Sequence, residues 1–144
     1  MSGNKNWIIS VTPKTWQAVE GSNAYATKTR VEPARIRKGD RMAFYVRGTG
    51  MFNCICRAET GWHEPSSYIW LHKQQHVTDE IDVSRVVTGV AGVRGLARSL
   101  QFAKRRTWIG LHLHGGLANY GRPITDKDLG MISDRMRQSP RLSV

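Results

Sequence analysis

The segment 36–59, IRKGDRMAFYVRGTGMFNCICRAE, constrains the fold of this chain more than any other stretch. It opens with a basic turn, continues as an apolar run, passes a glycine loop and returns as a second apolar run. Gly48 and Gly50 supply the permissive backbone that a chain reversal requires. The pattern predicts a β-hairpin over 42–46 and 51–58 with an apolar centre and a cationic rim. Such a hairpin suits the wall of a small barrel that binds phosphates.

Further elements are predicted on both sides of the hairpin. Before it we expect a strand over 7–11, a helical turn over 13–17 capped by Thr12, a loop over 20–23 and a short helix over 32–36. After it we expect an aromatic-rich loop over 60–70, a strand over 77–87, a helix over 93–104, a strand over 109–114, a loop over 115–121 and a last helix from Asp126 capped by Thr125. Short strands with a few short helices predict the α+β class and a small mixed barrel.

The length of 144 residues predicts one domain, with a core over about 6–137 and a loose tail over 138–144. No apolar run approaches the ~18 residues that span a bilayer, and the N-terminal apolar patch is too short for a signal peptide. We therefore expect a cytoplasmic protein without a membrane partner. Cys54 and Cys56 share one strand face, so they are expected to be small core residues and not a disulfide.

The formal charge of +11 is concentrated at the two ends of the chain. Residues 1–57 hold 10 basic against 3 acidic side chains, 58–102 hold 4 against 5, and 103–144 hold 8 against 3. This asymmetry suits a polyanionic partner, nucleic acid first, although a basic protein without such a partner is the alternative. The candidate phosphate contacts are Lys28, Arg30, Arg35, Arg37, Lys38, Arg41, Arg47, Arg105 and Arg106. The alternative for these side chains is a solvated charged face.

Large aromatic residues in or beside polar loops are the candidates for a base-binding pocket. Tyr25, Trp62 and Trp70 could form its walls, because bases stack on aromatic rings. The alternative is that these rings fold back as a lid on the core. Asn23, Ala26 and Thr27 are close to Tyr25 in sequence and could bond a base edge, or else form an ordinary polar segment.

Catalytic and metal motifs are missing from the sequence. It contains no G-x-S-x-G elbow, phosphate-binding P-loop or G-x-G-x-x-G, and its five histidines lack the paired spacing of a closed zinc site. We therefore expect no catalytic residue, no metal and no cofactor. A small nucleotide- or RNA-processing enzyme that uses His63, Glu64 or His112 stays open as an alternative.

Two segments carry a resemblance to a known family: K-G-D-x-x-x-F-Y-V at 38–46 and R-P-I-T-x-x-D at 122–128. With the opening N-W-I-I-S-V-T, their order resembles an EVE domain of the PUA-like superfamily, which is related to YTH domains. The resemblance implies a PUA-like mixed β pseudo-barrel flanked by short helices. It also implies a non-catalytic module that recognises a modified, methylated base in DNA or RNA.

The same resemblance assigns roles to two of the aromatic residues. Residues 25–27, Y-A-T, are similar to the W-[SA]-T motif of YTH domains, and residues 67–70, S-Y-I-W, are similar to their S-x-I-x-W loop. The resemblance thus places Tyr25 and Trp70 in the pocket. A generic RNA-binding PUA-like module remains the alternative, and the oligomeric state stays open.

Overall fold

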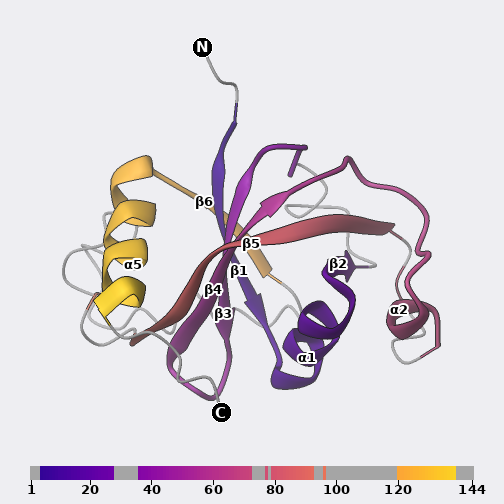
Figure 1. Cartoon of the computed structure of the whole chain (residues 1–144), viewed down its shortest axis with the longest axis horizontal. Coiled ribbons are helices and arrows are strands. Elements are labelled where there is room, and N and C mark those ends of the chain that lie inside the picture. The colour runs from indigo at the N-terminus through magenta and orange to yellow at the C-terminus, as the bar shows by residue number, and fades with distance from the viewer. Residues whose placement is uncertain are drawn as a thin grey trace.

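The computed structural model of this protein describes residues 4–27, 36–72, 77, 79–92, 96 and 120–138. Its strands form one sheet in the order β2-β5-β4-β3-β1-β6 (Figure 1). β1 runs parallel to β3, and every other neighbouring pair is antiparallel. The sheet is therefore mixed and curled, with short helices on its faces, which confirms the predicted α+β pseudo-barrel.

The strands are β1 (Asn6–Val11), β2 (Ala24–Thr27), β3 (Arg41–Val46), β4 (Met51–Ala58), β5 (Asp79–Gly92) and β6 (Tyr120–Ile124). The helices are α1 (Pro13–Ser22), α2 (Tyr68–His72) and α5 (Asp126–Gln138). None of the helices in the described residues combines the length and apolar content that crossing a membrane requires.

The predicted hairpin is confirmed as β3 and β4. Gly48 and Gly50 have φ angles of 87° and 70°, which only glycine adopts without strain. The strand pairing shifts by one residue along the hairpin, because Phe44 pairs with Cys54 whereas Tyr45 pairs with Phe52. The extra residue in β4 makes a β-bulge, and beyond it Arg41 lies directly opposite Arg57.

Helix α1 begins as predicted but ends later. The Thr12 hydroxyl accepts a hydrogen bond from the Thr15 N–H at 3.1 Å, which caps the first turn. The predicted loop over 20–23 is wrong, because the helix continues to Ser22 and ends at Asn23, in the left-handed conformation. Gly21 lies inside the helix, and this position requires glycine because a Cβ there would come within 2.6 Å of Ile69 Cδ1. This glycine lets α2 pack closely on α1.

Strand β5 is longer than predicted and belongs to two parts of the sheet. Residues 79–82 pair with β2, and residues 83–92 pair with β4. Two register shifts against β4 mark bulges, one of them around Gly89, whose φ is 138°. Bulges bend a strand and increase its twist, so this strand carries the curl of the sheet.

Strand β6 replaces the end of the predicted loop over 115–121. Tyr120 and Gly121 pair with Ser10 and Ile9 of β1, so the loop prediction is wrong for these two residues. Among the described residues β6 is the last strand in the sheet order, and proline is tolerated in an edge strand.

Helix α5 agrees with its prediction. The Thr125 hydroxyl accepts a bond from the Asp128 N–H at 3.1 Å, and Leu129, Ile132 and Met136 are buried. The other late predictions fall largely outside the described residues: the helix over 93–104 (where Leu96 alone is described, as buried), the strand over 109–114, the loop residues 115–119, and the tail beyond Gln138. The short helix over 32–36 is likewise described only at Ile36.

The sheet separates two apolar cores. The first lies under α1 and α2 and is rich in aromatic residues, among them Trp7, Trp16 and Phe44. The second lies under α5 and is mainly aliphatic, with Ile8, Ile55 and Ile132. Figure 1 shows α5 at the opposite end of the molecule from α1 and α2. Both predicted core cysteines are in the first core without a disulfide, and Cys56 Sγ donates a hydrogen bond to Cys54 Sγ at 3.8 Å.

Candidate nucleic-acid interface

The three predicted wall residues meet in one cluster around Tyr25. Its ring centroid lies 6.2 Å from that of Trp62 and 6.5 Å from that of Trp70, and both pairs pack edge to face. Phe44 of β3 closes the other side at 5.7 Å. Residues far apart in the sequence thus form one aromatic group under α1 and α2.

The indole N–H groups fix how two of these rings are oriented. Trp70 Nε1 donates to Ser22 Oγ at 2.9 Å and to the Ala24 carbonyl at 3.0 Å, where α1 ends and β2 begins. Trp62 Nε1 donates to the Ile36 carbonyl at 2.9 Å. The N–H of a buried tryptophan usually finds a hydrogen-bond partner, and these contacts hold the two rings in place.

The cluster is closed in this conformation. Tyr25 and Trp70 are 0% and 1% exposed, and their ring planes are nearly perpendicular, at 88°. A base sandwiched between two rings needs them parallel. Trp62 differs from both because it is only partly buried and packs on the outside of the core.

The polar candidates around Tyr25 are placed differently from one another. Asn23 ends α1, with its N–H donating to the Val19 carbonyl at 2.9 Å, and the residue is exposed. Ala26 is buried in the first core, and Thr27 is the last residue of β2. The three therefore follow one another from the surface into the sheet.

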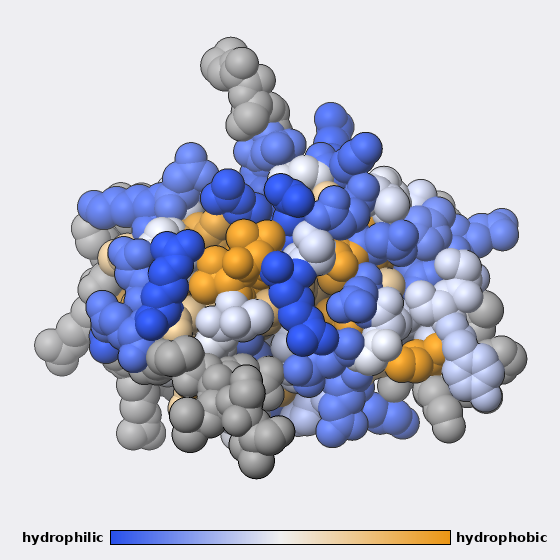
Figure 2. All heavy atoms as spheres, in the orientation of Figure 1, coloured by the Kyte–Doolittle hydropathy of each residue, from blue (hydrophilic) through white to orange (hydrophobic). Residues whose placement is uncertain are grey.

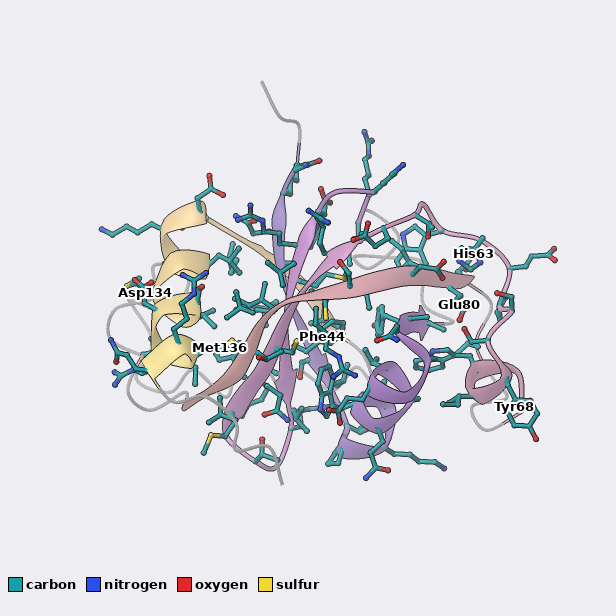
Figure 3. The ribbon with its side chains drawn as sticks, viewed as in Figure 1. Phe44, His63, Tyr68, Glu80, Asp134 and Met136 are labelled. Atoms are coloured by element: carbon teal, nitrogen blue, oxygen red, sulfur yellow. The ribbon has the colours of Figure 1, made fainter. Side chains whose placement is uncertain are left out.

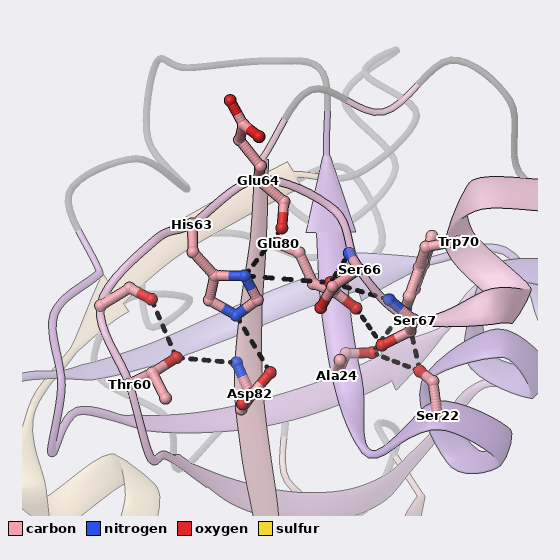
Figure 4. Close-up of polar contacts among 11 residues, drawn as sticks. Ser22, Ala24, Thr60, His63, Glu64, Ser66, Ser67, Trp70, Glu80 and Asp82 are labelled. Carbon is pink, nitrogen blue, oxygen red and sulfur yellow. Dashed lines mark hydrogen bonds and ion pairs between the residues drawn. The ribbon is translucent and has the colours of Figure 1, made fainter.

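A buried glutamate that sequence reasoning missed anchors the segment between Trp62 and Trp70. Glu80 of β5 is 0% exposed and accepts bonds from the Ser66 N–H at 2.6 Å and the Ser67 N–H at 3.2 Å. Both serine hydroxyls donate to it as well (Figure 4). In the sequence Glu80 is one of three acidic residues of the predicted strand over 77–87, and it alternates with Ile81 and Val83, so the pattern does not mark it as buried. The predicted loop over 60–70 is wrong at its end, because α2 begins at Tyr68 and carries Trp70. The bonds to Glu80 hold the two residues that come immediately before this helix.

Burial raises the pKa of Glu80, but the bonds from Ser67 and Ser66 outweigh burial and hold it below its ordinary value. The carboxylate is therefore the stable form. Figure 3 shows Glu80 and His63 together at one end of β5, with Tyr68 pointing away from the molecule.

His63 is part of the same anchor. Its backbone exchanges two 2.8 Å hydrogen bonds with Glu80, and its ring nitrogens contact the Glu64 carbonyl at 2.8 Å and Asp82 Oδ1 at 3.1 Å. The bond to the Glu64 carbonyl raises the pKa of His63, burial opposes this, and Asp82 adds to the rise. The described neighbours contact both ring nitrogens and so hold the His63 ring in place. Over the described ranges no three His, Cys, Asp or Glu side chains gather as metal ligands would.

The basic turn depends on a second buried acid, Asp40. Its Oδ2 accepts bonds from Trp7 Nε1 at 3.0 Å and the Arg37 N–H at 2.9 Å, and its Oδ1 accepts from the Lys5 N–H at 2.8 Å. Gly39 has a φ of 92°, and a Cβ there would lie 2.8 Å from the Asn4 side chain. These contacts explain the residues Gly39 and Asp40 in the K-G-D segment.

The structure brings together some of the predicted phosphate contacts and separates others. Arg37, Lys38 and Arg41 are exposed around the Asp40 turn, whereas Arg47 lies at the far end of the hairpin. Arg57, opposite Arg41, was missed because its position depends on the bulge in β4. The remaining candidates fall outside the described residues: Lys28, Arg30, Arg35, Arg105 and Arg106.

Solved structures share this arrangement of strands and helices. The YTH domain of the Zygosaccharomyces rouxii MRB1 protein, in complex with N6-methyladenosine RNA, superposes with a TM-score of 0.67 at 10% identity, covering 98% of this chain and 92% of that one. The fold is YTH-like. The YTH domain of Toxoplasma CPSF4, in complex with a 7-mer m6A-modified RNA, gives 0.65 at 11% identity over 99% and 97% of the chains.

Bacterial and archaeal proteins are similar as well. The protein Atu2648 of Agrobacterium tumefaciens superposes with a TM-score of 0.56 at 13% identity, covering 97% of this chain and 99% of that one. A UPF0310 protein of Saccharolobus solfataricus is 21% identical over 143 residues, which are 92% of this chain and 95% of the relative. No family model matches the chain.

Proposed function

We propose that this protein is an EVE-type nucleic-acid-binding module that recognises one modified, methylated base in RNA or DNA. The observation that carries the proposal is the convergence of Tyr25, Trp62 and Trp70 on a fold shared with YTH domains solved with N6-methyladenosine RNA. The basic turn at 37–41 supports it, because the Trp62 indole is bonded to Ile36, the residue immediately before that turn.

The base enters beside Trp62 in this proposal, because that ring is partly exposed while Tyr25 and Trp70 are enclosed. Moving Trp62 breaks its bond to the Ile36 carbonyl, at a net cost of about 1 kcal/mol. Stacking one base on an aromatic ring returns about 1–3 kcal/mol, so base capture can offset the opening. Tyr25 and Trp70 then form the inner wall.

Selection of a methylated base needs more than stacking. Burying one methyl carbon contributes roughly 0.8 kcal/mol, which is less than tenfold in affinity. The remaining discrimination comes from the fit of the enclosed inner wall, in which Trp70 is held by Ser22 and Ala24.

The test measures fluorescence anisotropy with labelled single-stranded RNA and DNA of one sequence, each with adenine or N6-methyladenine and with cytosine or 5-methylcytosine. We expect the protein to bind one modified strand at least several-fold more tightly than its plain counterpart. Equal affinity across the panel would contradict the proposal and leave the generic RNA-binding alternative.

Trp62→Ala should remove the preference while retaining the affinity for plain strands, since the ring is on the outside of the core. The matched control is Tyr68→Ala, which removes an aromatic ring that is 69% exposed on the neighbouring helix. Trp70→Ala is a weaker test, because deleting a fully buried tryptophan costs about 3–5 kcal/mol of stability.

A further inference from the structure

A groove lies on the sheet face that carries α5, away from the aromatic cluster. Its volume is about 660 Å³, and Ile55, Val87 and Leu129 form its apolar floor. Arg41 and Arg57 line it from the hairpin, and Arg137 lines it from α5. Figure 2 shows apolar atoms exposed at the centre of this face between hydrophilic side chains.

A β-bulge turns one further apolar side chain into the groove. Ile55 pairs with Val87 and Cys56 pairs with Arg85, so Val86 is an extra residue without a partner in the register. Val86 lines the groove and is 48% exposed, one of the few large apolar residues on the described surface. Bulges that aim a side chain are features of binding surfaces more than packing defects.

The hairpin places two positive charges side by side at the edge of this floor. Arg41 and Arg57 are direct cross-strand partners, so their side chains share one face of the sheet, and both residues are exposed. Like charges directly opposite one another are unfavourable unless an anion lies between them. Arg57 also bonds Glu59 Oε1, at 3.1 Å and 3.3 Å, which neutralises only part of this pair.

The other charged groups around the groove leave the end that carries Arg41 and Arg57 positive. Asp126 accepts a bond from the Asn6 amide, and Asp134 lies 4.0 Å from Arg137 on the α5 side. Lys5, Arg37 and Lys38 are exposed at the adjoining turn, where Asp40 holds the backbone of the first two. A ligand that combines apolar faces with regularly spaced negative charges is complementary to this surface.

We propose that the groove holds a stretch of single-stranded nucleic acid, with one phosphate between Arg41 and Arg57, another near Arg137, and a sugar or base face on Val86. A single strand fits because its unpaired base faces are free to pack on the apolar floor, whereas a duplex keeps them inside its stack. The inference rests on the proposed function but adds a second contact surface, on the opposite face of the sheet from the aromatic cluster.

The experiment measures anisotropy of labelled single-stranded RNA, plain and N6-methylated, with the full chain at several salt concentrations. The variants are Arg41→Gln with Arg57→Gln, Arg137→Gln, and Val86→Asp. Arg135→Gln is the matched control, since it removes the same charge from α5 at an exposed position that does not line the groove. Urea unfolding confirms that each variant is folded.

We expect the double variant to weaken both RNAs by about tenfold or more and to lower the salt slope by about 0.7, the value for one lost phosphate contact on a single strand. Val86→Asp should weaken both RNAs without changing stability, and Arg135→Gln should bind like the wild type. Groove variants that also bind like the wild type would overturn the inference. So would displacement of the RNA by polyglutamate as effectively as by unlabelled RNA of equal charge, because that would assign the groove to acidic protein segments.

The two proposals fail in different ways. If the wild type binds methylated and plain RNA equally but the groove variants lose affinity, the base-recognition proposal fails and the groove inference stands. If the wild type prefers methylated RNA but the groove variants bind as tightly as the wild type does, the groove inference fails alone.

Discussion

The two faces of the sheet differ in side-chain composition and in how open they are. The face under α1 and α2 holds a closed aromatic cluster in which the Trp70 indole N–H is bonded to Ser22 and Ala24. The face under α5 holds an open groove with arginines above an aliphatic floor. The comparison suggests that selectivity and affinity are carried by separate surfaces. The Asp40 turn joins the surfaces, because it bonds Trp7 in the first core and precedes Arg41 in the groove.

Asp40→Ala should have the largest effect, because it damages both faces together. The variant leaves Trp7 Nε1 and the N–H groups of Lys5 and Arg37 without their acceptor. We expect a loss of about 3 kcal/mol in the free energy of unfolding, measured by urea denaturation. Asp134→Ala, an exposed acid on α5, is the control and should change stability little. A loss below about 1 kcal/mol would show that the turn does not depend on Asp40.

Glu80→Gln should damage the aromatic face alone. A neutral amide cannot accept all of the bonds from the Ser66 and Ser67 groups, so we expect to lose about 2 kcal/mol of stability. Base preference should fall while the affinity for plain strands persists. Glu64→Gln is the matched control, because Glu64 is exposed and its carbonyl, not its carboxylate, contacts His63. Equal losses for plain and modified strands would mean that the two faces are coupled.

The pH dependence of stability should reveal the same anchor with a smaller effect. Glu80 has a lowered pKa, so its stabilisation is present above the ordinary glutamate pKa of about 4.5 and is lost as the pH falls through the folded value. His63 has a raised pKa, so its stabilisation is present below about 6.5 and is lost as the pH rises through the folded value.

Glu80 and His63 both stabilise the fold fully between about pH 4.5 and pH 6.5. The midpoints of urea unfolding, measured from pH 3 to pH 9, report how this stabilisation is lost on either side. His63→Gln should reduce the loss of stability at high pH and leave the loss at low pH unchanged. Glu80→Gln should reduce the loss of stability at low pH. An unchanged loss at high pH in the His63 variant would remove His63 from the anchor.

The reactivity of the Cys54 and Cys56 thiols should report how tightly the aromatic face is closed, and this measurement requires no destabilising variant. The hydrogen bond with Cys54, together with burial, raises the pKa of the Cys56 thiol well above its usual range. We expect both thiols to react with a disulfide reagent only after unfolding in urea, as followed by absorbance. Immediate reaction in buffer would show that the face opens readily. Slow reaction that Trp62→Ala accelerates would locate the opening at Trp62.

Local chemistry explains why much of the fold was predictable. The hairpin, the Thr12 and Thr125 caps and the apolar face of α5 depend on residues within four positions of one another. The end of α1 and the helix α2 were missed because both depend on distant partners. Gly21 lies in the last turns of α1, where Ile69 of α2 packs closely against it. The segment before α2 is held by hydrogen bonds to Glu80 of β5.

The candidate site also has features that depend on local sequence and features that depend on distant partners. The sequence alone identified Tyr25, Trp62 and Trp70, the basic turn and the charge of +11, because residue type and spacing are local properties. Only the tertiary structure decided that the rings pack edge to face and that Arg41 pairs with Arg57. Without the bulge in β4, the register set at Val46 and Met51 would place Arg41 opposite Cys56. Register and burial depend on which strands meet, and a bulge of one residue changes every partner beyond it.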